Sequence, residues 1–145
     1  MHSAQNFSAL AELARGHIET GDTRTARIFL EKIRKGDRQN YRVRLVWALL
    51  FARESKRRDA LREMDAALQK YAEIAPNLTL EAAEFYAILG EKTKALDWLE
   101  KAVRNGDERV EWFRRNPLLE SIRGEFRFKS LLDSIAFRRQ KKSSD

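Results

Sequence analysis

An alanine returns at an almost constant interval through the first two thirds of the sequence. Ala26, Ala60 and Ala95 follow one another at spacings of 34 and 35 residues. Each of them stands five residues after a turn-forming glycine or serine, and apolar residues follow it at helical spacing. Self-similarity with a period of about 20–50 residues is typical of repeat proteins, in which each copy is one supersecondary unit. The sequence therefore predicts a stack of three similar units.

The stretch 86–103 shows most clearly what each unit is. Gly90 allows a first helix to end in a left-handed residue, and Ala95, Leu99 and Ala102 then share one stripe of a second helix. Because alanine is small, the axes of the two helices can approach to roughly 8 Å. Each unit is therefore predicted to be a helical hairpin.

The two upstream units keep this spacing. The positions of Gly90, Ala95, Leu99 and Ala102 correspond to Gly21, Ala26, Leu30 and Ile33 in the first unit, and to Ser55, Ala60, Met64 and Ala67 in the second. The aromatic position before the turn holds His17, Phe51 and Tyr86 in order. This pattern resembles the tetratricopeptide-repeat (TPR) family. The resemblance implies an all-α fold, a right-handed superhelix of three TPR hairpins at about residues 7–38, 41–74 and 76–106.

The segment after residue 106 is rich in apolar side chains but does not repeat the pattern. A solenoid exposes an apolar edge at its last repeat, and a terminal segment of this kind is expected to cover it. We expect a C-terminal helical cap over residues 107–140, with a short helix at about 108–115, a turn at Asn116-Pro117, a brief helix that ends at Ile122, and a last helix at about 126–139. Residues 1–6 and 141–145 are expected to be disordered, and the chain 1–145 to form a single domain.

The cap sharpens the resemblance. Its residues are similar to the extension that closes TPR regions in bacterial multidomain signalling proteins, at Trp112, Asn116-Pro117-Leu118, Ile122-Arg123, Arg127-Phe128 and Leu131-Leu132. This similarity implies a bacterial origin, and either a detached TPR region or a stand-alone adaptor.

The sequence contains few residues suited to catalysis. It has no cysteine and only two histidines, His2 and His17. No group of histidine and acidic residues has the spacing of metal ligands. Its six glycines are dispersed and form no phosphate-binding loop. We therefore expect no enzyme activity, cofactor or metal. The sequence also lacks a secretory pattern and a long apolar run, so we expect no membrane insertion and a cytoplasmic location.

The first helices of stacked hairpins line a concave side, where residues not packed into the hairpin can meet a ligand. The candidate peptide-binding residues by spacing are Arg15, Arg42, Leu45, Leu49, Arg53, Asn77, Leu80 and Glu84. Arginines bind carboxylates and leucines seat apolar side chains, so the expected partner is a peptide or helix with acidic and apolar residues. Reversing the charge of Arg15 and Arg53 is expected to weaken it without unfolding the chain. The leucines could instead be covered by the cap or by a second copy, and Glu81 and Glu84 are expected to face solvent.

The net charge of +7 leaves other functions open beside a protein-interaction scaffold. Basic clusters at 56–58, 114–115 and 138–142 could bind nucleic acid, but they are not interleaved with aromatic residues, which makes this partner less favoured. Self-association is the other alternative, through an apolar edge of the terminal repeat near Phe7 and Leu10.

Overall fold

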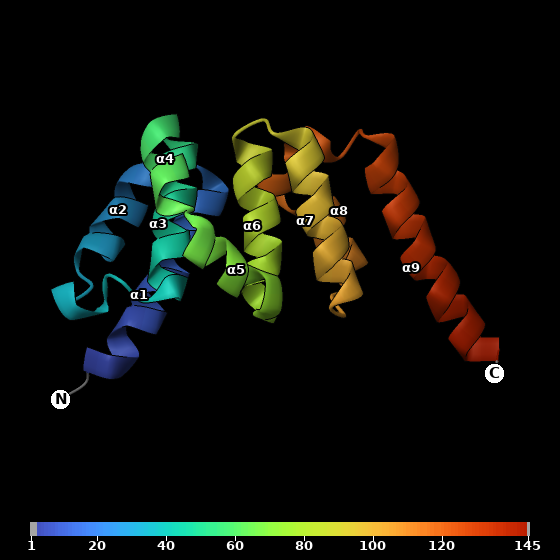
Figure 1. Cartoon of the computed structure of the whole chain (residues 1–145), viewed down its shortest axis with the longest axis horizontal. Helices are drawn as coiled ribbons and strands as arrows, with labels where there is room; N and C mark the ends of the chain where they lie inside the picture. The colour runs from blue at the N-terminus through green and yellow to red at the C-terminus, as the bar shows by residue number, and fades with distance from the viewer. Residues whose placement is uncertain (1–2, 145) are drawn as a thin grey trace.

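The computed structural model describes residues 3–144, and every regular element in this range is a helix (Figure 1). In chain order these are α1 (Ser3–Thr20), α2 (Thr23–Glu31), η1 (Lys35–Asp37), α3 (Tyr41–Arg53), α4 (Arg57–Glu63), α5 (Ala66–Ile74), α6 (Pro76–Ile88), α7 (Lys92–Arg104), α8 (Val110–Arg115), η2 (Pro117–Ile122) and α9 (Phe126–Ser144), where η marks a 3-10 helix. The all-α prediction is therefore confirmed for the described part of the chain. None of its helices combines the length and the apolar character needed to cross a membrane.

The same backbone turn ends α1, α3 and α6. Gly21, Ser55 and Gly90 have φ angles of 86°, 63° and 80°. In each turn the next residue donates its N–H to the carbonyl five positions earlier, at 2.8 to 2.9 Å. This is a Schellman motif, which satisfies carbonyl groups at a helix end. The repeat period in the sequence is therefore a period of helix-ending turns, although Ser55 has a side chain where glycine is favoured.

The periodic alanines lie where the two helices of a hairpin meet. Ala26, Ala60 and Ala95 are all fully buried, and α2, α4 and α7 pack on α1, α3 and α6 respectively. Three successive helix pairs with one small contact residue each are thus confirmed.

The second unit differs from its expected form. Ala60, Met64 and Ala67 were expected to share one stripe of a single second helix, but that helix is broken between α4 and α5 at Met64 and Asp65. Asp65 caps α5, because its side chain accepts a hydrogen bond of 2.9 Å from the Leu68 N–H. The break leaves Ala67 exposed rather than in the packing stripe, and α5 packs against α6.

The helices at both ends are longer than the sequence suggested. α1 begins at Ser3, and α9 continues to Ser144. Helical backbone thus extends into 3–6 and 141–144, for which disorder stays a prediction, while Met1, His2 and Asp145 lie outside the described residues. The ends of α8 at Arg115 and of η2 at Ile122 agree with the expected helices of the cap, while α8 begins two residues later than expected and η2 begins at Pro117, where a turn was expected.

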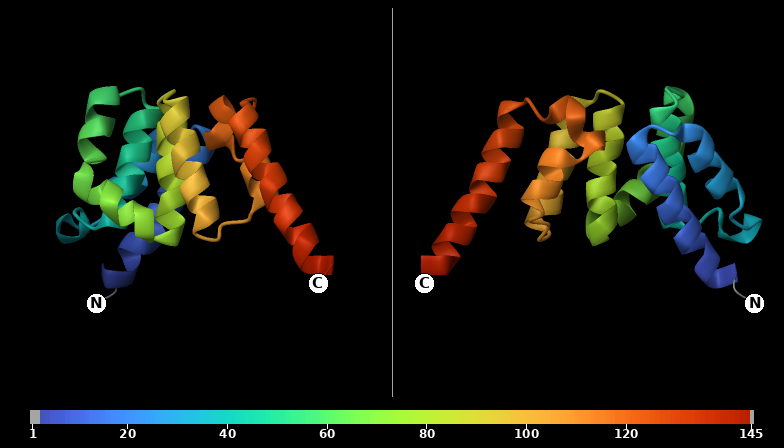
Figure 2. Two further views of the ribbon diagram at one scale, coloured as in Figure 1. Left: turned by 45° about the vertical axis from the view of Figure 1, so that its right-hand side comes forward. Right: turned by 180° about the vertical axis from the view of Figure 1, so that it is seen from behind.

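Helix α6 lies at the centre of the fold (Figure 2). It packs on α3 and α5 on one side, on α7 along the hairpin, and on η2 of the cap. Every residue from Leu78 to Ala87 is buried as a result. Because α1 also packs on α3, the first helices of the three hairpins lie in the order α1, α3, α6.

Candidate binding groove

Two glutamates are buried on the central helix. Glu81 and Glu84 of α6 are 4% and 0% exposed, so the expectation that they face solvent is wrong. The residues around them on α6 are apolar and pack against neighbouring helices in all directions. Between Leu78 and Ala87 almost no surface of the helix is left for water, so the polar residues of this stretch are buried together with the apolar ones. Buried carboxylates need charged or hydrogen-bonding partners, since desolvation is otherwise very costly.

Glu84 finds its partners on two other parts of the chain. Arg15 of α1 donates to both of its carboxylate oxygens at 2.6 Å, the bidentate geometry that makes arginine–carboxylate pairs strong. The side chain of Asn116 donates to Glu84 at 2.6 Å and accepts from the Leu118 N–H at the start of η2. The Glu84 carboxylate thus joins the first hairpin, the third hairpin and the cap.

Glu81 extends the network toward the surface. It accepts from Arg15 at 2.9 Å and from Arg42 of α3 at 2.7 Å. Arg42 also pairs with Glu12, and Arg15 with Glu19 at 3.2 Å. Two guanidinium groups are therefore shared among four carboxylates at the junction of α1, α3 and α6.

The protonation of these groups reflects burial. Burial raises the pKa of Glu81 to about 7, although Arg42 and Arg15 oppose the shift. Burial also raises the pKa of Glu19, which is nearer the surface. Burial lowers the pKa of Arg15. The charges of Glu84 and Glu81 outweigh this effect and raise the pKa above its ordinary value, so Arg15 stays protonated.

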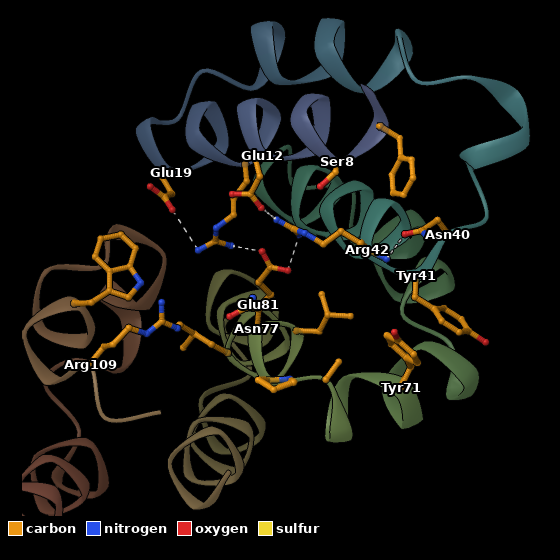
Figure 3. Close-up of a pocket in the computed structure, with 17 residues that line it drawn as sticks. Ser8, Glu12, Glu19, Asn40, Tyr41, Arg42, Tyr71, Asn77, Glu81 and Arg109 are labelled. Carbon is orange, nitrogen blue, oxygen red and sulfur yellow. Dashed lines mark hydrogen bonds and ion pairs between the residues drawn. The ribbon is translucent and has the colours of Figure 1, made fainter. Parts of the chain in front are cut away.

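A groove opens to solvent beside this network (Figure 3). Its volume is about 690 Å³, and residues of α1, α3, α5, α6 and α8 line it. Aromatic side chains provide much of its wall, namely Phe7, Tyr41, Tyr71 and Trp112. Tyr41 and Tyr71 pack with ring centroids 4.7 Å apart, and Tyr71 remains 43% exposed.

The structure brings only some of the predicted residues to the groove. Arg15, Arg42, Asn77 and Leu80 line it, and Leu80 is almost completely buried. The other predicted residues do not: Leu45, Leu49 and Glu84 are fully buried, and Arg53 donates instead to the Ile18 carbonyl at 3.2 Å. A spacing rule cannot separate the groove side of a first helix from the side that packs on the next hairpin.

The arginines do not present free positive charge to a ligand. Arg15 and Arg42 are bonded to carboxylates of the chain itself, which removes the basis for expecting an acidic partner. Charge reversal at Arg15 would also place a third carboxylate beside Glu81 and Glu84, so the expectation that this variant stays folded is corrected.

Several lining residues were missed from the sequence. Tyr41, Tyr71, Trp112 and Arg109 come from segments outside the first helices or from their ends. The sequence pattern places Trp112 in the cap and not in the groove. It also does not predict the break before α5, the helix that carries Tyr71. Asp65, a typical N-cap residue, was the available signal for that break.

The fold and the groove define an all-helical protein built from packed helical hairpins, with an open groove where first helices and cap meet. The described residues contain no cluster of three or more acidic or histidine side chains arranged for a metal ion. No protein-family model matches the chain, and neither a curated protein nor a solved structure matches it.

Proposed function

We propose that the three hairpins are tetratricopeptide repeats in a right-handed superhelix, and that the chain is a non-catalytic protein-interaction module. Its ligand is a peptide or helix bound in the groove. The observation that carries this proposal is the position of the groove, at the junction of α1, α3 and α6. First helices line the concave ligand side of stacked hairpins, and about 690 Å³ is a volume typical of ligand sites.

The composition of the groove wall supports peptide binding. Tyr and Trp are enriched among the residues that dominate binding energy at interfaces. Tyr41, Tyr71 and Trp112 offer flat surfaces on which an apolar side chain can pack. Because Arg15 and Arg42 already bond to Glu84 and Glu81, binding relies on these apolar contacts rather than on an acidic ligand.

Rigidity of the wall is a second support. Arg15 joins α1 to α6, Arg42 joins α3 to α6, and Asn116 joins the cap to α6. A wall that is ordered before the ligand arrives loses less conformational entropy on binding. The buried network therefore serves to hold the elements of the groove in place.

The test is to fill the groove without removing any of its contacts. Ser8 is exposed and lines the groove, whereas its neighbour Ala9 is exposed and does not. Peptides are selected from a displayed random library on the wild-type chain, and their affinities are measured by isothermal titration calorimetry. Ser8→Tyr should weaken binding at least about tenfold, while Ala9→Tyr should leave it unchanged. Equal affinities for both variants would exclude the groove as the binding site.

A further inference from the structure

The last two turns of α9 form an exposed arm. Among the helix residues up to 143 whose burial is described, Ile135 is the last buried one, and residues 136–143, here called the arm, are exposed. Figure 1 shows α9 leaning away from α7 toward the C-terminus. Phe137 is 66% exposed, as is Phe126 at the start of the same helix, at 82%.

The two sides of the arm have different roles. Ala136, Arg139, Gln140 and Ser143 line a cleft toward α8, and Arg139 bonds to the Glu108 carbonyl. At 100° per residue, Phe137, Arg138, Lys141 and Lys142 fall on the opposite side of the helix. The outward side of the arm is therefore basic, with one large apolar side chain.

Acidic groups outnumber basic groups in the ion-pair network beside the groove. Among the described residues, those that line the groove and their ion-pair partners include five carboxylates, Glu12, Glu19, Glu81, Glu84 and Asp107, but three guanidinium groups, Arg15, Arg42 and Arg109. Glu12, Glu19, Glu81 and Glu84 share the two guanidinium groups of Arg15 and Arg42, so acidic groups outnumber basic groups in this network. The side chain of Glu12 is 63% exposed. This region is thus acidic on a chain whose net charge is +7.

The arm does not face the groove of its own chain. Arg109 and Trp112, at the start and middle of α8, line the groove, whereas Val110, Glu111 and Arg114 line the cleft toward α9. Helix α8 therefore stands between the groove and the arm. Contact between these two complementary surfaces requires a second molecule.

We propose that the arm of one copy docks into the groove of another copy of this chain, with Phe137 among the groove aromatics and Arg138 and Lys142 beside Glu12 and Glu19. This contact rests on the proposed function, because it uses the same groove. It joins two different surfaces, so an open complex has a free groove at one end and a free arm at the other, whereas a closed ring has neither. Association in either form increases with concentration.

Complementation between two variants tests this contact. Ser8→Tyr blocks the groove and keeps the arm, whereas the double variant Phe137→Ser/Arg138→Glu alters the arm and keeps the groove. Sedimentation velocity is measured from about 5 to 500 µM, a range suited to the weak affinity of a small interface. The wild type should associate, each variant alone should associate at least about tenfold more weakly, and their equimolar mixture should form a dimer that does not grow further.

Controls separate this contact from other contacts. Ala9→Tyr and Phe126→Ser change exposed positions outside the groove and the arm, and both should associate like the wild type. Far-UV circular dichroism checks that all variants are folded. A wild type that stays monomeric overturns the contact, and so does a mixture that stays monomeric. Association that persists in the arm variant also overturns it, in favour of another surface such as the edge near Phe7 and Leu10.

The failure of this contact differs from that of the proposed function. If the wild type stays monomeric but Ser8→Tyr still weakens the binding of the selected peptides, the groove remains a peptide site. The arm is then excluded as its occupant. Peptide binding unaffected by Ser8→Tyr excludes the groove for both.

Discussion

Arg15 and Glu84 are 69 positions apart in the sequence, yet both carboxylate oxygens of Glu84 accept hydrogen bonds of 2.6 Å from the Arg15 guanidinium. The pair is buried between α1 and α6, which belong to the first and third hairpins. Asn116 of the cap shares the same carboxylate. This contact therefore connects elements that successive hairpin packing alone would keep apart.

Removing Arg15 should destabilise the fold strongly. Arg15→Met leaves Glu84 and Glu81 buried with less compensation, and breaking a buried pair in this way costs about 3–5 kcal/mol. Urea unfolding followed by circular dichroism measures the loss. Arg24→Met, at an exposed arginine, should stay within about 0.5 kcal/mol of the wild type.

The double variant Arg15→Met/Glu84→Met identifies the cause. It removes the unpaired charge at Glu84 and should be more stable than Arg15→Met alone, because two apolar groups replace a broken ion pair. A double variant that is no more stable than Arg15→Met would show that the unpaired charge at Glu84 is not the cause of the loss.

Stability should decrease as pH rises from about 5 to 8. Glu81 has a pKa of about 7 in the folded state and 4.5 as its ordinary value, so the folded state binds its proton more tightly than the unfolded state does. Linkage then gives higher stability at low pH and a loss on the order of 2–3 kcal/mol as Glu81 ionises. The raised pKa of Glu19 acts in the same direction. Urea midpoints at several pH values measure the slope.

Glu81→Gln is the control for this titration. The amide cannot ionise, so most of the decrease between about pH 5 and 8 should disappear. Below this range the lowered pKa of Asp65, which caps α5, reverses the sign, because stability is lost as that group becomes protonated. An unchanged slope in Glu81→Gln would assign the pH dependence to other groups.

Ser55→Gly should stabilise the second hairpin. Ser55 has a φ of 63° at the position where the other two hairpins have glycine. Relief of this left-handed strain should raise the free energy of unfolding by up to about 1 kcal/mol, less the added flexibility of the unfolded chain. Ser130→Gly, at an exposed position inside α9, should instead lower it by about 0.5 kcal/mol. Thermal unfolding should thus shift in opposite directions for the two variants.

Asp65→Ala should weaken the break between α4 and α5. The Asp65 side chain caps α5 through the Leu68 N–H, and loss of such a cap costs about 1 kcal/mol. Asp133→Ala, at an exposed position inside α9, should have little effect. Chemical denaturation compares the two, and equal losses would show that the cap contributes nothing specific.

The hairpins were predictable because their determinants are local. A left-handed residue at 21, 55 and 90, and a buried alanine five positions later, follow directly from spacing. The groove was less predictable because it depends on which side of each first helix meets its neighbours. Leu45 and Leu49 were expected at its surface but are core residues. The near-continuous apolar character of 78–87 is the sequence signal for a helix that packs on all sides. In such a helix Glu81 and Glu84 are buried as well.

The shared carboxylate of Glu84 changes how the chain is expected to unfold. In most repeat proteins each unit contacts only its neighbours, and the units can open one after another from an end. Here α1, α6 and the cap are tied at one buried point, so opening either end exposes the same uncompensated charge. The two ends are thermodynamically linked, and the repeats between them should open together in a single cooperative step.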